Sequence, residues 1–172
     1  MTKSKTPSES ASTMTEMVLP NDTNPLNNLM GGRLMHLMDI VAAITAQRHS
    51  NSLVVTASVD NVSFSHPIAL GDVVTLHAKV TRAFKTSMEI HLQVSSENIP
   101  SGKKQETHSA FFTFVAVDNE GKPIRVPEVI PETDSERELY DGALRRRQLR
   151  LILSGRLKPE DAPELRSLFL IG

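Results

Sequence analysis

The longest apolar stretch of the chain has the length and composition of a helix. Residues 29–47 read LMGGRLMHLMDIVAAITAQ, which is too long for one strand and rich in Leu, Met and Ala. Wound at 3.6 residues per turn, the apolar side chains occupy most of the circumference, a pattern typical of a buried helix. The polar interruptions Arg33, His36 and Asp39 are spaced by three and share one side. We predict one long helix that is buried nearly all round.

Strand patterns dominate the chain after this helix. Apolar and polar residues alternate strictly in two stretches, which predicts half-buried strands, and a third stretch, AFFTFVAV, is apolar on both faces and predicts a central strand. In a fourth stretch the alternation loses its phase near Asn61, which indicates a bulge or a bend. The stretches are, in chain order, residues 53–64, 74–81, 88–95 and 110–117.

The order of the elements indicates the fold class. A short strand at 14–19 precedes the helix, and four strands follow it. Consecutive strands joined by short turns predict an antiparallel sheet, and the single helix is the layer available to cover it. We therefore predict an α+β fold in which an antiparallel sheet wraps around one long central helix.

Composition changes along the chain predict three regions. Residues 1–13 are polar and rich in Ser and Thr, which favours disorder. Residues 14–126 carry the helix and the strands and form the predicted domain. Residues 127–172 begin as a proline-broken linker and continue as a helical extension, in which Ser135 and Glu138 match a capping box.

Composition and charge exclude several functional classes. The 19 basic and 20 acidic side chains nearly cancel, which argues against a globally basic nucleic-acid binder. The chain has no cysteine, so disulfide scaffolds, zinc ribbons and thiol nucleophiles are excluded. No apolar run approaches the roughly 20 residues of a membrane helix, and the first residues do not read as a signal peptide. We expect no membrane insertion and a location in the cytoplasm.

The start of the predicted helix is the most informative place for chemistry. Gly31 and Gly32 allow a ligand to approach the backbone, and the N–H groups of a helix N-terminus suit an oxygen anion. Asp39, about two turns further on, is the only acid of this helix. A carboxylate in a buried helix needs partners. Asp39 is therefore either a structural charge paired with Arg33 or His36, or a functional group.

Other catalytic patterns are missing. No HExxH or similar metal spacing is present, so no metal site is predicted. No GxSxG elbow supports a Ser–His–Asp triad. Met30, Met35 and Met38 in the helix either line an acyl tunnel or belong to the core.

Three longer segments resemble the acyl-CoA thioesterase family of hotdog fold. They read PNDTNPLNNLMGGRLMHLMD, VTASVDNVSFSHPIALGD and KTSMEIHLQV, and the FTFVAVD run follows them. The similarity spans roughly residues 14–126 and is closest to the cytosolic acyl-CoA hydrolase branch. It implies a hotdog fold and hydrolysis of acyl-CoA to free fatty acid and CoA. It implies no cofactor, since coenzyme A is part of the substrate and of the product.

The resemblance also implies roles for single residues. Asp39 is the implied catalytic carboxylate, acting either as general base on a water or as nucleophile through an anhydride. Asn24 is implied to orient water or polarise the thioester, and Thr56 to help hold the attacking water. Gly31 and Gly32 are implied to present backbone N–H groups to the thioester oxygen as an oxyanion hole.

For coenzyme A, the resemblance points to one strand junction. Lys85, Thr86 and Ser87 are similar to an Arg/Lys-Thr-Ser element of the family, and Arg82 is close by. Cations and hydroxyls of this kind suit the phosphates of the nucleotide. The alternative is a solvated hairpin with no ligand. The Arg145–Arg147 run needs no ligand, because basic residues complement the end of a helix.

The resemblance has two local departures. Asn27 and Met30 stand where the family has a glycine and a histidine. The family also implies a homo-oligomer, a trimer of dimers, with Asn24 and Asp39 of one site supplied by different subunits. Acyl-CoA is the implied partner, and nucleic acid is not. The alternatives are a non-catalytic acyl-CoA sensor of the same fold and a hotdog dehydratase using His36.

Overall fold

The computed structural model describes residues 4–60, 62 and 64–167. They fall into two compact units, one ending at Ile130 and the other beginning at Pro131. The boundary expected after residue 126 lies four residues further on, because Val126 and Val129 are buried in the first unit. Val129 also bridges to Lys5 of the N-terminal segment.

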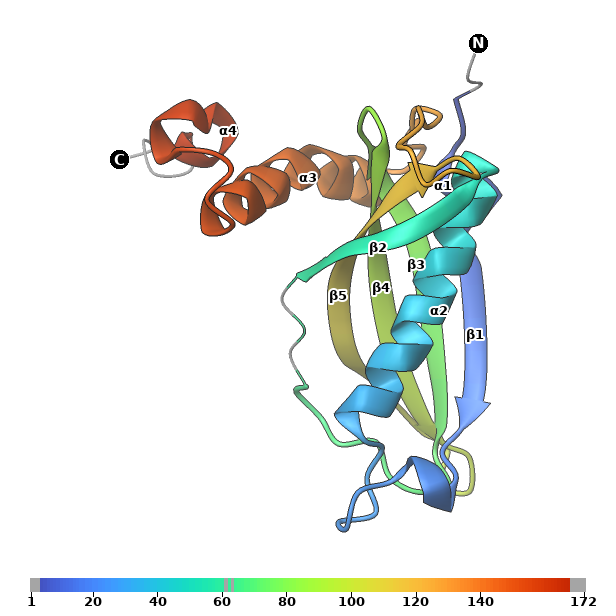
Figure 1. Ribbon diagram of the computed structural model, residues 1–172. Helices are drawn as coiled ribbons and strands as arrows, with labels where there is room; N and C mark the ends of the chain where they lie inside the picture. The colour runs from blue at the N-terminus through green and yellow to red at the C-terminus, as the bar shows by residue number, and fades with distance from the viewer. Residues whose placement is uncertain (1–3, 61, 63, 168–172) are drawn as a thin grey trace. The chain divides into compact units, whose positions relative to one another are not determined.

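The first unit contains a curled sheet of five strands, all antiparallel to their neighbours (Figure 1). Its spatial order is β1-β3-β4-β5-β2. The α+β prediction is confirmed. The strands are β1 (Ser12–Met17), β2 (Leu53–Asp60), β3 (Val73–Ala83), β4 (Ser87–Asn98) and β5 (Lys103–Val117).

The order of the strands differs from their order in the chain at one place. Strands β3, β4 and β5 follow one another as neighbours, as the short turns predict, but β2 lies at the far edge beside β5. The middle position belongs to β4, while β5 is an interior strand whose Phe112 and Phe114 are fully buried. The bulge predicted near Asn61 occurs earlier, where the β2–β5 register shifts between Thr56 and Ser58. Asn61 itself lies outside the described residues.

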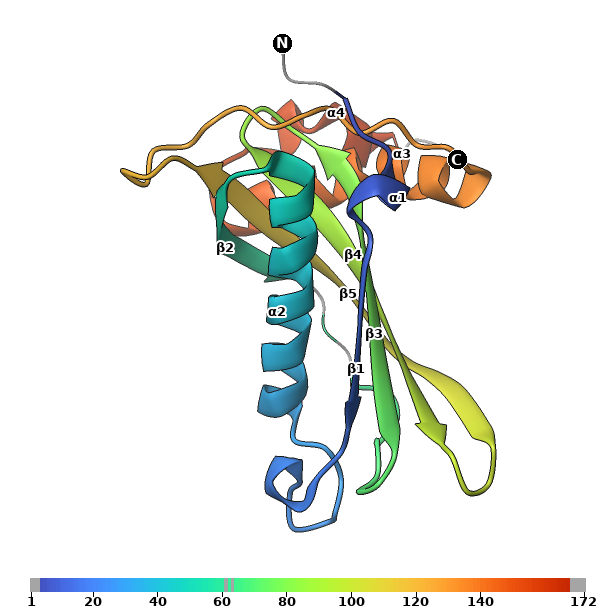
Figure 2. The same ribbon diagram turned by 90° about the vertical axis from the view of Figure 1, so that its right-hand side faces the viewer.

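Helix α2 (Gly31–Ser50) lies against one face of this sheet (Figures 1 and 2). It begins two residues later than predicted, because Met30 takes an extended N-cap conformation with a ψ of 135°. The prediction that the side chains of this helix are buried around its whole circumference is wrong for the single chain. Leu34 and Met38 face the sheet and are buried, but Met30 at the N-cap and Ile44 are 40% and 37% exposed. One sheet covers only one side of a helix, so the opposite apolar side remains uncovered.

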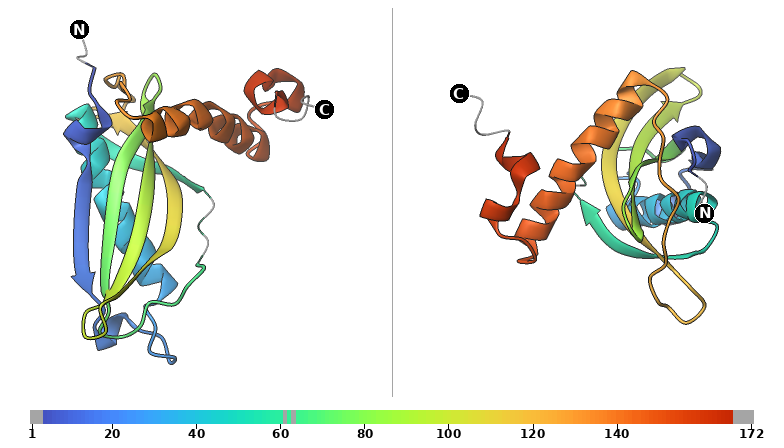
Figure 3. Two further views of the ribbon diagram at one scale, coloured as in Figure 1. Left: turned by 180° about the vertical axis from the view of Figure 1, so that it is seen from behind. Right: turned by 90° about the horizontal axis from the view of Figure 1, so that it is seen from above.

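The N-terminal segment is ordered where the structure describes it, in contrast to the disorder expected for residues 1–13. Helix α1 (Pro7–Ser10) precedes β1, and it lies beside the C-terminal end of α2 (Figure 3). The Lys5 Nζ group donates to the Arg48 carbonyl at 2.6 Å and to Asn51 Oδ1 at 2.5 Å. A cation there complements the negative end of the helix dipole. Residues 1–3 lie outside the described residues.

The second unit consists of helices. Helix α3 (Asp134–Leu153) is followed by the 3-10 turn η2 (Pro159–Asp161) and the short helix α4 (Pro163–Arg166). The capping box is formed by Thr133 and Glu136, two residues before the predicted pair Ser135 and Glu138. Both pairs match the same sequence pattern, and the one whose first residue takes the extended N-cap conformation forms the cap.

A buried histidine at the end of α2 makes stability depend on pH. His49 has no exposed surface, its Nε2 lies 3.0 Å from the Pro127 carbonyl, and its Nδ1 has no partner among the described residues. Burial lowers the pKa of His49, the Pro127 carbonyl opposes this, and the charge of Lys5 lowers the pKa further. Well above pH 6.5 the ring is neutral in both the folded and the unfolded state. Below that value the unfolded chain takes up the proton first.

We therefore expect the free energy of unfolding to fall as the pH drops below about 6.5, by at most about 1.4 kcal/mol per pH unit for each such group. His77 and His108 act in the same direction, because burial lowers their pKa as well. Urea unfolding between pH 7.5 and 5 measures how steeply the free energy of unfolding changes with pH. His49→Gln keeps a donor for the Pro127 carbonyl and is expected to flatten the slope. A variant slope equal to that of the wild type contradicts the assignment to His49.

Candidate active site

The loop before α2 is fastened to the first turn of the helix by Asp22. Its Oδ1 accepts a hydrogen bond from Arg33 Nε at 2.9 Å, and its carbonyl accepts from the Met30 N–H at 2.8 Å. Its Oδ2 accepts from the Leu19 N–H at 3.1 Å. Arg33 is thus the ion-pair partner of Asp22 and not of Asp39, which removes one of the structural interpretations of Asp39.

Asn24 is held rigidly by the turn that follows it. Its Oδ1 accepts from the N–H groups of Leu26 at 2.9 Å and Asn28 at 3.2 Å. Because backbone donors occupy the side-chain oxygen, the Nδ2 group is the donor end of this amide. Within the turn, Asn27 has a φ of 58°, a conformation that asparagine and glycine adopt most readily. Asn27 therefore meets the same backbone requirement as the glycine of the family pattern.

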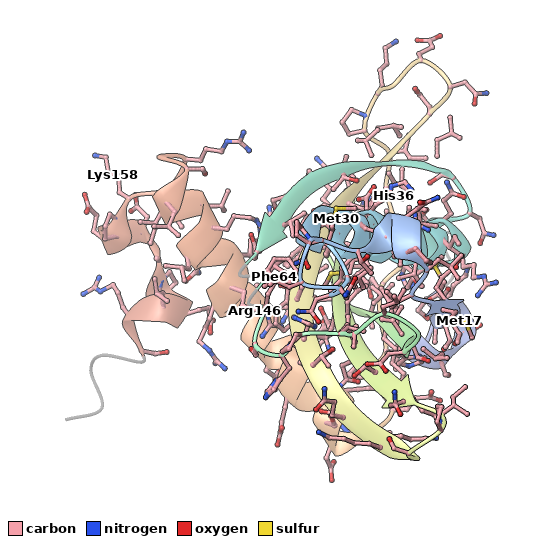
Figure 4. All side chains as sticks on the ribbon, turned by 90° about the horizontal axis from the view of Figure 1, so that it is seen from below. Met17, Met30, His36, Phe64, Arg146 and Lys158 are labelled. Atoms are coloured by element: carbon pink, nitrogen blue, oxygen red, sulfur yellow. The ribbon has the colours of Figure 1, made fainter. Side chains whose placement is uncertain are left out.

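The predicted oxyanion hole corresponds to the beginning of α2. The first hydrogen bond within the helix runs from the Leu34 N–H to the Met30 carbonyl, so the preceding N–H groups have no acceptor inside the helix. Phe64, whose side chain is labelled in Figure 4, lies beside the first residue of this helix: a Cβ on Gly31 would be 3.3 Å from its Cζ, so a side chain there would press on the ring. A Cβ on Gly32 would meet nothing within 4 Å, so the space where a side chain would stand at this position is open.

Asp39 and Thr56 are brought together by the packing of α2 against β2. The Thr56 hydroxyl donates to Asp39 Oδ1 at 2.8 Å. Thr56 is exposed and Asp39 is half-buried, so the carboxylate keeps access to its second oxygen. The hydroxyl of Thr56, rather than Arg33 or His36, is the hydrogen-bond partner that the described residues offer Asp39. Among the described residues, Asp39 therefore forms neither of the charge pairs with Arg33 or His36 that the structural interpretation offered.

A cavity of about 370 Å³ opens beside the start of α2. Two predicted site residues, Asn24 and Gly31, line it, whereas Gly32, Asp39 and Thr56 do not. Several other residues of the cavity wall were not predicted from the sequence as site residues. These are Asn28, Leu29, Leu34, Phe64, His66, Pro67, Ile68 and His108.

The predicted site therefore forms two groups within one chain. Asn24 and Gly31 belong to the cavity, and Asp39 and Thr56 form the hydrogen-bonded pair. Asp39 lies eight residues beyond Gly31, which corresponds to about 12 Å along the helix. One thioester is too small to touch both groups at that separation.

The predicted coenzyme A element forms the tight turn between β3 and β4. The Phe84 N–H donates to the Ser87 carbonyl at 2.8 Å, and the Thr86 carbonyl accepts from Ala116 at 2.9 Å. Lys85 lines a second cavity of about 610 Å³. Thr86 and Ser87 are absent from its lining.

The same cavity includes a cation that sequence reasoning missed. Arg125 lines it together with Lys85, Ser4 and Glu128, whereas Arg82 does not. Arg82 lies opposite Glu89 in the β3–β4 ladder instead. Arg125 is distant from the Lys-Thr-Ser element in the chain, so no local motif connects the two.

In the described part of the chain, no three His, Cys, Asp or Glu side chains are grouped so that they could hold a metal ion. No helix of this part has the length and hydropathy needed to span a membrane.

Comparison with known proteins decides the family. The sequence model of the thioesterase superfamily matches residues 26–103. A Bacillus subtilis protein named as an uncharacterized acyl-CoA thioester hydrolase is 43% identical over 138 residues, which is 80% of each chain. The chain belongs to the thioesterase superfamily. A second relative, the cytosolic acyl coenzyme A thioester hydrolase of Rattus norvegicus, is 37% identical over 158 residues, covering 90% of this chain and 42% of the rat protein.

Solved structures of thioesterases share the fold. A hexameric acyl-CoA thioesterase superposes with a TM-score of 0.86 at 41% identity, covering 88% of this chain and 97% of that chain. An acyl-CoA hydrolase of Staphylococcus aureus in complex with butyryl coenzyme A and coenzyme A gives 0.81 at 41% identity, covering 88% and 94%. The expected hotdog fold is confirmed by these thioesterases. Variants of the Staphylococcus aureus enzyme with an aspartate, an asparagine or a threonine replaced by alanine have also been solved.

Proposed function

We propose that the protein hydrolyses acyl-CoA thioesters to a free fatty acid and CoA, with Asp39 as the catalytic carboxylate. The observation that carries the proposal is the 2.8 Å hydrogen bond from Thr56 to Asp39, which orients a half-exposed carboxylate on a thioesterase fold. Aspartate, asparagine and threonine are also the residues changed in the Staphylococcus aureus hydrolase variants, which supports the choice of Asp39, Asn24 and Thr56. The cytosolic relative supports a location in the cytoplasm.

The reaction needs a base, a water and a stabilised oxyanion. In the base route, Asp39 takes a proton from water, the resulting hydroxide attacks the carbonyl carbon, and the C–S bond breaks. The proton then passes from Asp39 to the leaving thiolate, so that a fatty acid and CoA are released. In the nucleophile route, Asp39 attacks the carbonyl carbon and the C–S bond breaks, which gives a mixed anhydride and the CoA thiolate. Water then cleaves the anhydride to the fatty acid and the restored Asp39 carboxylate, and the proton that is released goes to the thiolate. Both routes need no cofactor besides the coenzyme A of the substrate.

The helix start and Asn24 supply the donors for the oxyanion. The N–H groups of Gly31 and Gly32 have no acceptor inside the helix, and the positive end of the helix dipole adds to their effect. The Nδ2 group of Asn24 is held by a turn that fixes the other end of its amide. Donors fixed in advance stabilise the developing charge without reorganisation, and removing one typically lowers the rate on the order of 10²–10³-fold.

A second copy of the chain completes the site in this proposal. Within one chain, Gly31 at the cavity and Asp39 of the hydrogen-bonded pair are about 12 Å apart along the helix. The uncovered side of α2 and the edge strand β2, with Val55 half exposed, give this face apolar surface and unpaired backbone groups. A two-fold partner on this face covers both elements and places its Asn24 near Asp39. A trimer of such dimers is supported by the hexameric thioesterase of similar structure.

Lys85 and Arg125 are the proposed partners of the coenzyme A phosphates, because both line the larger cavity. Lys85→Ala is expected to raise the KM for acyl-CoA about three- to tenfold with little change in kcat. The effect is modest because an exposed lysine makes a solvent-screened ion pair. Steady-state thiol release at several salt concentrations measures the KM. The difference in KM between Lys85→Ala and the wild type should shrink as the salt concentration rises.

Lys122→Ala is the matched control for this variant. Lys122 is an exposed lysine paired with Glu120 on the turn after β5 and lines neither cavity. It is expected to keep the wild-type KM. An unchanged KM in Lys85→Ala removes this lysine from the phosphate site.

A further inference from the structure

His108 is a buried residue whose ring nitrogens the fold leaves without partners among the described residues. It lies on β5 and is 8% exposed, yet neither ring nitrogen has a hydrogen-bond partner among the described residues. The edge of the Phe64 ring packs against it, with ring centroids 5.4 Å apart and planes inclined by 63°. Buried polar atoms in native proteins are nearly always paired. Two orphaned nitrogens on one ring therefore point to a ligand.

The ring lines the same cavity as two parts of the catalytic apparatus. Asn24 and Gly31 are on its wall, and Leu29, Leu34 and Ile68 provide apolar surface. A largely apolar cavity with few fixed polar groups is typical of a ligand site. The cavity also reaches the start of α2, so His108 borders the same space as Gly31, the first residue of this helix.

The ring offers one donor and one acceptor near neutral pH. Burial lowers the pKa of His108, and the nearby His66 lowers it further, so the imidazole is uncharged. A neutral imidazole has one N–H and one bare nitrogen. An amide offers the complementary C=O and N–H, whereas a thioester carbonyl offers only an acceptor and a phosphate carries charge. The pantetheine arm of coenzyme A contains amides close to the thioester.

We propose that His108 binds a pantetheine amide of the acyl-CoA substrate in the cavity beside Asn24 and Gly31. This inference rests on the proposed thioesterase function and adds a residue that determines substrate affinity. His108 acts on binding and does not take part in the proton transfers of Asp39. The loss of its hydrogen bonds therefore affects KM rather than kcat.

The test compares His108→Leu with His108→Asn. Leucine fills the site without polar atoms, and asparagine restores one donor and one acceptor. For acyl-CoA, His108→Leu is expected to raise KM about five- to thirtyfold with kcat within about twofold of the wild type. His108→Asn is expected to recover most of this loss. The Kd for CoA, measured by calorimetry, follows KM.

A thioester without amides distinguishes the loss of the contact between His108 and the pantetheine arm from a distortion of the whole site. With the thioester of the same acyl group and ethanethiol, His108→Leu is expected to match the wild type. It is also expected to unfold at a higher temperature, because it removes unpaired buried polar atoms. His77→Leu is the control, since His77 is hydrogen-bonded to Thr13 and lines neither cavity. It is expected to keep the wild-type KM.

Two outcomes overturn the assignment. One is an unchanged KM and Kd in His108→Leu, and the other is an equal loss on both thioesters, which indicates a structural role. If the wild type hydrolyses neither thioester, the proposed function fails. In that event the Kd for CoA still decides whether His108 contacts the pantetheine arm.

Discussion

Asp39→Ala is expected to lower kcat for acyl-CoA hydrolysis by about 10²–10⁴-fold, the usual contribution of a positioned general base. Without the carboxylate, the described residues leave Thr56 no other hydrogen-bonded side chain that could accept a proton from water or attack the thioester. The oxyanion donors at the start of α2 remain, so a residual rate above that of the uncatalysed reaction is expected. Thiol release at saturating acyl-CoA measures the loss, and size-exclusion chromatography verifies that the assembly is unchanged.

A second substitution of Asp39 and one control variant complete this experiment. Asp39→Asn keeps an oxygen that accepts the Thr56 hydrogen bond but removes the base, so it is expected to be as inactive as the alanine variant. Asp141→Ala, an exposed acid of α3, is expected to retain full activity. More than a tenth of the wild-type kcat in either Asp39 variant is incompatible with Asp39 as base or nucleophile.

The second large effect is a restoration of activity by mixing two inactive chains. Asn24→Ala is expected to lower kcat about 10²–10³-fold, as the loss of an oxyanion donor does. If each site takes Asn24 from one chain and Asp39 from its partner, a mixed dimer of the two variants has one intact site. Random pairing of equal amounts puts half of the chains in mixed dimers. About a quarter of the wild-type activity is therefore expected after co-expression.

The control for mixing is the double variant carrying both substitutions. Combined with either single variant, it forms no intact site and is expected to stay inactive. If the Asn24→Ala and Asp39→Ala chains together are no more active than each alone, the two residues serve one site within the same chain. That result contradicts the interface-built site.

The fold class could be predicted from local sequence patterns, because helix and strand periodicity depend on residues that are close together in the chain. Strict alternation predicts β3 and β4, and the length and composition of residues 29–47 predict most of α2. The position of β2 beside β5 depends on long-range pairing, which periodicity does not encode. The N-terminal segment reads as disordered by composition, but the hydrogen bonds of Lys5 to the end of α2 order it.

The site residues also divide into those that a local segment predicts and those that only the fold brings to the site. Asn24, Asp39 and Thr56 were found because each lies in a segment that resembles the family, and the structure then pairs Asp39 with Thr56. Arg125 and His108 lie outside those segments and reach their cavities through the fold. His108 did carry one signal, since it falls in phase with the buried residues Ala110, Phe112 and Phe114 of β5. A histidine on the buried face of a strand needs a partner, and the local sequence supplies none.

The most direct test of the central claim is free-thiol release from a panel of acyl-CoAs, from short to long chains, by the purified wild-type protein. Turnover well above background is expected for at least part of the panel, and for Asp39→Asn kcat is expected to fall by about 10²–10⁴-fold. No turnover on any acyl-CoA, with acyl-CoA still bound, contradicts hydrolysis. That result favours a non-catalytic sensor in which Met30, in place of the family's histidine, marks the lost activity.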